Sequence, residues 1–200
     1  MIQSQQHYLA FHKLKVDQVV CLCTEKSGGT IYQVKALLRD SKRKDSQILI
    51  LQLGENDIKK DTNPKEIARK LISLAYSYLD DHPHCKKVYI GQLLKRHFAK
   101  HNKYINTLQQ SLEFNINIAA TNHHIQKSLK RLQDNRITYF HHKDMNDHRH
   151  QHEEIVNLPK DPIHLNKTGE KRLARSWRGM LLNFLKEEKE GRNIRIEFSS

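Results

Sequence analysis

The chain has 200 residues, which is enough for one domain with a hydrophobic core of its own, and its hydrophobic residues, 37% of the total, fall in short runs. With 35 Lys and Arg against 22 Asp and Glu, the formal net charge is +13, which favours anionic partners such as nucleic acid and carries no information about the fold. The first residues lack the apolar segment of a signal peptide and no run approaches the roughly 20 apolar residues of a membrane span, so a cytoplasmic protein is expected if Met1 is the true start.

In chain order, the first half of the sequence is predicted to form a helix, a strand, a helix, a strand and a helix at residues 8–14, 17–23, 31–39, 47–53 and 65–79. The two strands, DQVVCLC and QILILQL, are short apolar runs of the kind found in strands covered on both faces. The third helix has a clear start, because Asn63 is a favourable N-cap and Pro64 suits the first helical position.

The second half of the sequence continues this alternation. A strand is predicted at residues 87–94, followed by a long, mostly helical region at 102–132 with a break near 115–117. A short strand at 137–140 and a strongly amphipathic helix at 168–186 complete the pattern.

Strands that alternate with helices predict an α/β domain, a three-layer α/β/α sandwich around a parallel sheet. We expect the domain to span residues 1–187 and a charged C-terminal tail to occupy 188–200.

The three cysteines, Cys21, Cys23 and Cys85, are odd in number, so a reducing compartment is favoured over a disulfide framework. In parallel sheets, ligands bind beyond the carboxyl ends of the strands, and candidate functional residues are expected there.

Two predicted strands are followed by residues that could bind an oxyanion. Gly28 and Gly29, after the strand at 17–23, form either a plain tight turn or a close backbone approach to a ligand. The GEND stretch after the strand at 47–53 is either a turn and helix cap or the site of a neutral amide donor, Asn56. Such a donor stabilises developing negative charge without having to ionise.

A third motif, DPIHLNKTG, comes just before the last predicted helix. Its Asp161 stands three residues before His164, and a carboxylate so placed can orient an imidazole and stabilise its cation. This partnership serves nucleophilic catalysis by a hydroxyl group. The alternative is that Asp161 caps a turn and His164 is simply exposed.

Together and in this order, the GGTI, GEND and DPIHLNKTG motifs resemble those of the SGNH (GDSL-type) hydrolase superfamily. The resemblance implies a flavodoxin-like three-layer fold and hydrolysis of a small-molecule, lipid or carbohydrate ester. It also implies a mechanism without metal or cofactor, in which a serine attacks the ester and His164, oriented by Asp161, takes its proton. Gly28 and Asn56 match the positions of the oxyanion hole.

The sequence departs from the family pattern at the nucleophile. The family serine ends a first buried strand in a G-D-S motif, whereas here the candidate is Ser4, with Ile2 and Gln3 in place of Gly and Asp. The first strand is therefore largely missing. Either the start is truncated and the intact protein is an ordinary hydrolase, or the chain is a degenerate copy that retains the scaffold without catalysis.

The degenerate alternative is a binding module for nucleic acid or protein. Its support is the net charge of +13, the basic residues 42–44 and the basic residues of the last helix, Lys171, Arg172, Arg175 and Arg178. The competing interpretation of these charges is a solvated helix face.

The His-rich residues 141–154 contain enough imidazole and carboxylate to bind a divalent metal. A His-x-His-x-His run presents its rings well only when it is extended, so a solvated loop is expected. A metal site and a pH-sensitive or anion-binding surface are the alternatives.

Overall fold

The computed structural model describes residues 29–40, 46–98, 100, 105–143, 145, 156–157 and 161–197. For residues 40, 156–157, 161–163 and 191–197 the description concerns the backbone alone. The predicted helix at 8–14, the predicted strand at 17–23 and the basic residues 42–44 lie outside the described residues.

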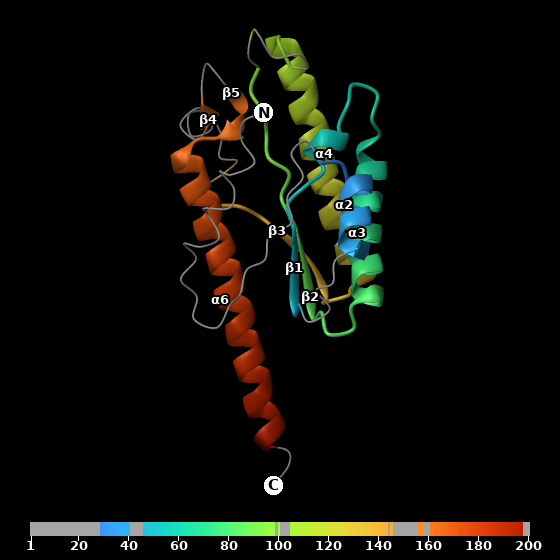
Figure 1. Ribbon diagram of the computed structural model, residues 1–200, viewed down its shortest axis with the longest axis vertical. Helices are drawn as coiled ribbons and strands as arrows, with labels where there is room; N and C mark the ends of the chain where they lie inside the picture. Colours follow the sequence, from blue (N-terminus) through green and yellow to red (C-terminus); the bar gives the residue numbers. More distant parts are fainter. Residues whose placement is uncertain are drawn as a thin grey trace.

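Within the part of the chain that the structure describes, a parallel three-stranded sheet lies at the centre (Figure 1). Its strands β1 (Ile48–Leu51), β2 (Lys87–Gly91) and β3 (Ile137–Phe140) follow one another in space as they do in sequence. All three were predicted from the sequence. A second sheet, which was not predicted, pairs β4 (Val156–Asn157) antiparallel with β5 (Asp161–Leu165).

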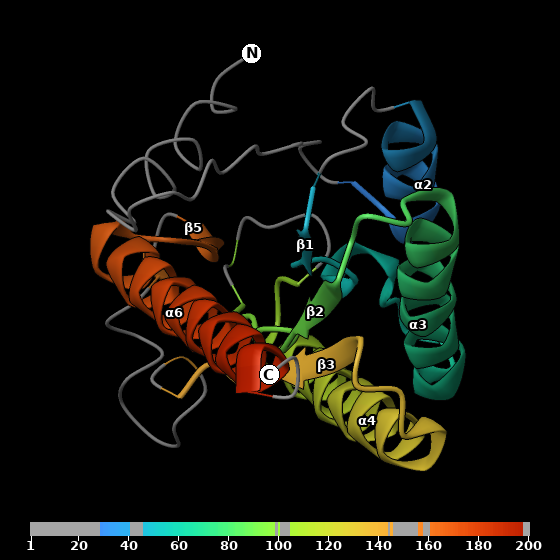
Figure 2. The same cartoon turned by 90° about the horizontal axis from the view of Figure 1, so that it is seen from below.

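Helices flank both sides of the central sheet (Figures 1 and 2). On one side lie α2 (Ile31–Asp40), α3 (Pro64–Asp81) and α4 (Leu108–Leu132), and on the other lies α6 (Lys167–Glu197). The predicted three-layer α/β/α arrangement is therefore confirmed. Among the described helices, none is long and apolar enough to cross a membrane.

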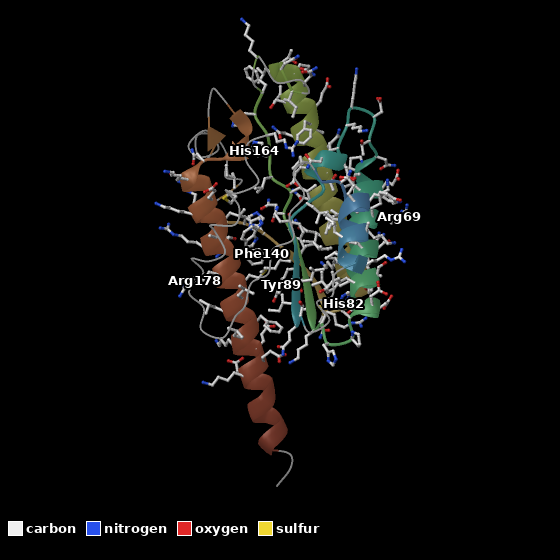
Figure 3. All side chains as sticks on the ribbon, viewed as in Figure 1. Arg69, His82, Tyr89, Phe140, His164 and Arg178 are labelled. Atoms are coloured by element: carbon white, nitrogen blue, oxygen red, sulfur yellow. The ribbon has the colours of Figure 1, made fainter. Side chains whose placement is uncertain are left out.

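Each face of the central sheet has its own hydrophobic core, because side chains alternate along a strand. Val88 and Ile90 of β2 pack with α3 and α4, whereas Tyr89 between them packs toward α6. On the α6 side, the rings of Tyr89 and Phe140 meet edge to face at 6.3 Å between centroids (Figure 3). Trp177 of α6 belongs to the same core.

The starts of two helices follow from local capping. The Asn63 side chain accepts a hydrogen bond from the Lys65 N–H at 2.9 Å, and Pro64 opens α3, as predicted. In α4, Thr107 and Gln110 form a capping box, in which each side chain accepts a hydrogen bond from the other residue's backbone N–H.

Two predictions of helix extent are corrected by the structure. The break predicted near residues 115–117 was wrong, because α4 runs unbroken from Leu108 to Leu132. The last helix, predicted to end at 186, continues to Glu197, since its Glu and Lys residues favour helix and Lys186 lies 3.7 Å from Glu190, one turn further on. The helix therefore crosses the boundary proposed between domain and tail.

Candidate active site

The candidate site lies beyond the carboxyl end of β1, where the chain makes a sharp turn into the short 3-10 helix η1 (Glu55–Asp57). Gly54 makes this turn possible. Its φ of 121° is rarely adopted by residues with a side chain, and a Cβ there would lie 3.2 Å from Leu71 and 3.4 Å from Leu93.

Two side chains of η1, those of Glu55 and Asp57, bind different segments of the chain. Glu55 Oε1 accepts a hydrogen bond from the Leu94 N–H at 3.0 Å, and Asp57 Oδ2 accepts one from the Ile31 N–H, also at 3.0 Å, at the start of α2. The sequence left open whether the GEND stretch is a turn and helix cap or the site of an amide donor. In the structure, Asp57 of this stretch caps the start of α2. Burial raises the pKa of Asp57, while the Ile31 N–H and the charges of Lys70 and Lys59 oppose that rise.

Asn56 lies between two partners that fix the orientation of its amide. Its Nδ2 donates to the backbone oxygen of Gly29 at 3.3 Å, and its Oδ1 accepts from Arg96 Nη2 at 2.9 Å. Because a guanidinium has donors only, the oxygen of the amide must face Arg96 and the nitrogen must face the backbone of Gly29. The structure therefore brings Asn56 to Gly29. Gly28 lies outside the described residues, so the shared oxyanion role of Gly28 and Asn56 stays a prediction.

Arg96 is the functional candidate that the sequence interpretation missed. Its guanidinium lies over the ring of Phe114, 5.2 Å from the centroid. Burial lowers the pKa of Arg96, and the negative charge of Glu55 opposes that effect. Arg96 stands 40 residues from Asn56 in sequence. Their contact therefore could not be predicted from a local sequence pattern.

The segment that carries Arg96 runs along α4 and is held there by two asparagines. Asn122 pairs with both the N–H and the C=O of Leu93, at 2.9 and 3.0 Å, and Asn115 pairs in the same way with Arg96, at 2.9 Å each. Ser111 Oγ adds a bond to the Arg96 oxygen at 2.8 Å. The two asparagines stand seven residues apart and therefore share one face of α4. This spacing was the sequence pattern from which their common role could have been predicted.

A buried polar network lies at the ends of β1, β2 and β3. His142, which is fully buried, contacts Gln52 Oε1 through Nε2 and Ser176 Oγ through Nδ1, both at 2.8 Å. Gln52 Nε2 donates to the Gln92 oxygen at 3.0 Å, and Gln92 Oε1 accepts the His142 N–H at 3.0 Å. Since the Gln52 amide is thereby oriented, we assign the His142 proton to Nε2 and the Ser176 hydroxyl as donor to Nδ1.

This network explains two further features of the sequence. A side chain at Gly91 would collide with Gln52 Oε1, so only glycine leaves room for the Gln52–His142 contact. Burial, with a smaller contribution from His141, lowers the pKa of His142 to about 4. His142 is therefore a neutral structural histidine of the His-rich stretch, and within the described residues no group of three or more His, Cys, Asp or Glu could hold a metal ion.

The DPIHLNKTG motif forms β5 and the start of α6. His164 is exposed and lies at the carboxyl end of the central sheet (Figure 3), the end at which η1 follows β1. Asn166 caps α6 by accepting the N–H groups of Thr168 and Gly169, at 2.9 and 3.0 Å. The structure describes only the backbone of Asp161, and Ser4 lies outside the described residues. The contact of Asp161 with His164 and the role of Ser4 as nucleophile therefore stay predictions.

Comparisons with known proteins agree with this architecture. The sequence matches the family of GDSL-like lipases/acylhydrolases over residues 22–177. The fold is similar to the crystal structure of a "putative acylhydrolase" from Bacteroides fragilis, with a TM-score of 0.54, 15% identity, and coverage of 79% of this chain and 72% of that one. No curated protein matches the chain. Since the family match extends over most of the chain and includes Gly28 and Gly29, η1 and the DPIHLNKTG motif, the chain belongs to the GDSL-like lipase/acylhydrolase family of SGNH hydrolases.

Proposed function

We propose that the chain hydrolyses an ester by a Ser-His-Asp mechanism in which Asn56 donates to the oxyanion. The observation that carries the proposal is the Asn56 amide, exposed at the carboxyl end of β1 and oriented so that its nitrogen faces the backbone oxygen of Gly29. Family membership supports hydrolase chemistry, and the ester is a small-molecule, lipid or carbohydrate ester.

The proposed reaction begins when the Ser4 hydroxyl attacks the ester carbonyl carbon and His164 takes the hydroxyl proton. The carbonyl oxygen becomes an oxyanion, which accepts hydrogen bonds from the Gly28 N–H and from Asn56 Nδ2. The intermediate collapses, and the alcohol leaves with the proton from His164. A water molecule then attacks the acyl-enzyme, gives its proton to His164, and releases the acid while the proton returns to Ser4.

Asn56 suits the oxyanion role for an electrostatic reason. Arg96 donates to the amide oxygen, so the amide cannot flip and present that oxygen to a developing negative charge. A donor fixed before the reaction needs no reorganisation in the transition state, which is where such groups contribute most.

The test is hydrolysis of p-nitrophenyl butyrate by the chain and by two histidine variants. His164→Ala should abolish the activity, because no other group is proposed to accept the serine proton. His84→Ala is the matched control, since His84 is exposed in the turn before β2, at the opposite end of the sheet. Full activity in His164→Ala, or no hydrolysis by the parent chain, would contradict the proposal.

The alternative, a binding module for nucleic acid, rests on the basic face of α6. Lys171, Arg175 and Arg178 are exposed at helical spacing, and Arg178 lies on the side of α6 away from the sheet (Figure 3). If this face contacts phosphates, affinity for single-stranded RNA should fall steeply as salt rises. Absence of binding at about 50 mM salt would reject the alternative.

A further inference from the structure

Arg96 places a positive charge beside the proposed oxyanion donor, one hydrogen bond from the Asn56 amide. We propose that its guanidinium binds an anionic group of the substrate, so that the preferred esters carry a carboxylate or phosphate on the acyl side. This inference rests on the proposed function, because it names the substrate class of the same site.

The position of Arg96 is fixed before any ligand arrives. Its backbone N–H and C=O are both held by the Asn115 side chain, and its guanidinium rests against the ring of Phe114. A long side chain normally loses conformational freedom when it binds, which weakens the interaction. Here α4 has already ordered the residue, so an anion would meet a preorganised fork of donors.

Arg96 is half-buried, and within the described residues its guanidinium forms no hydrogen bond to a carboxylate. Among the described residues its one hydrogen bond goes to the neutral oxygen of Asn56. Glu55 is the acidic group whose charge acts on it, and the Oε1 of that carboxylate is engaged by the Leu94 N–H. A cation partly removed from water gains more from an anion than an exposed one does, because the local dielectric is lower.

Arg96 also orients Asn56, and this second role must be separated from anion binding. Loss of the orienting contact should lower the turnover of every ester by the same factor. Loss of anion binding should instead lower the turnover of anionic esters alone. The ratio of kcat/KM between a charged and an uncharged ester therefore reports on anion binding with the common factor removed.

The experiment compares mono-p-nitrophenyl adipate with p-nitrophenyl hexanoate, which have acyl chains of equal length. The wild-type chain should prefer the adipate ester by about tenfold or more in kcat/KM. Arg96→Gln should bring that ratio close to one and lower both rates, whereas Arg96→Lys should retain part of the preference. Lys60→Gln, which removes one exposed positive charge in the loop before α3, is the matched control and should leave the ratio unchanged.

Three outcomes would overturn the inference: no preference in the wild type, a preference that survives Arg96→Gln, or one that falls equally in Lys60→Gln. If neither ester is hydrolysed, the proposed function fails, and binding decides the inference separately. Calorimetry with adipamate (adipic acid monoamide) and hexanamide should then show tighter binding of the adipamate, lost in Arg96→Gln. Equal binding of the two amides by the wild type would overturn the inference without reference to catalysis.

Discussion

At the scale of single residues, two polar side chains near the candidate site have their orientations fixed by unlike partners. The Asn56 amide meets a cation at its oxygen and a backbone carbonyl at its nitrogen. The His142 ring meets an amide oxygen at Nε2 and a hydroxyl at Nδ1. Asn56 is exposed, whereas His142 is wholly buried and connects the strand ends to α6 through Ser176.

The burial of His142 should make stability depend on pH. A histidine in the unfolded chain titrates near pH 6.5, while the pKa of folded His142 is about 4. As the pH falls from about 6.5 to about 4, the unfolded chain binds a proton that the folded chain does not. The free energy of unfolding should therefore decrease over this range, by at most roughly 3 kcal/mol from this residue.

Urea unfolding at pH 7 and pH 4.5 measures this contribution. His142→Gln should show a smaller loss of stability between the two pH values than the wild type, because glutamine does not titrate. His123→Gln, at an exposed position of α4, is the control and should behave as the wild type does. A wild-type loss that is unchanged in His142→Gln would refute the assignment.

At the scale of elements, α4 acts as a template for the extended segment that carries Arg96. Two turns of helix separate Asn115 from Asn122, and each asparagine pairs with both backbone groups of one residue in the segment, as a neighbouring strand would. This arrangement explains the wrong prediction of a break near residues 115–117. Asparagine disfavours helix when its side chain competes for nearby backbone, but here the distant segment occupies it.

Asn122→Ala should destabilise the protein by about 2–4 kcal/mol, because the N–H and C=O of Leu93 would be left buried without these partners. The measurement is the midpoint and slope of urea unfolding. Asn117→Ala, at a half-buried position on the same helix, should change stability by no more than about 0.5 kcal/mol. Equal effects of the two substitutions would show that the pairing contributes nothing specific.

At the scale of the whole molecule, the three-layer arrangement could be predicted because each helix and strand is marked by the hydrophobic periodicity of its own residues. Three strands of the central sheet and four flanking helices were recovered, whereas the oxyanion role of Asn56, inferred from motif order, stays a prediction. Arg96 and the Gln52–His142 pair could not be predicted, since their partners stand 40 and 90 residues away. β5 was missed because its pattern, DPIHL, contains a proline and little alternation.

The boundary predicted between the domain and the tail, at residues 187 and 188, falls within the C-terminal part of α6. This part extends beyond the central sheet (Figure 1), and an ion pair between Lys86 and Glu188 connects it to the domain. Partly exposed ion pairs contribute about 1 kcal/mol or less. Removal of residues 188–200 should therefore lower the free energy of unfolding by no more than about that amount, as measured in urea, and a loss several times larger would place the boundary elsewhere.

The turnover of Asn56→Ala measures how much the Asn56 amide contributes to stabilising the oxyanion. With p-nitrophenyl butyrate, kcat should fall by roughly 100- to 1000-fold while KM changes little, because the lost hydrogen bond forms in the transition state. Asn135→Ala, in the exposed turn before β3, should retain the parent kcat. A kcat for Asn56→Ala equal to that of Asn135→Ala would rule out Asn56 as an oxyanion donor.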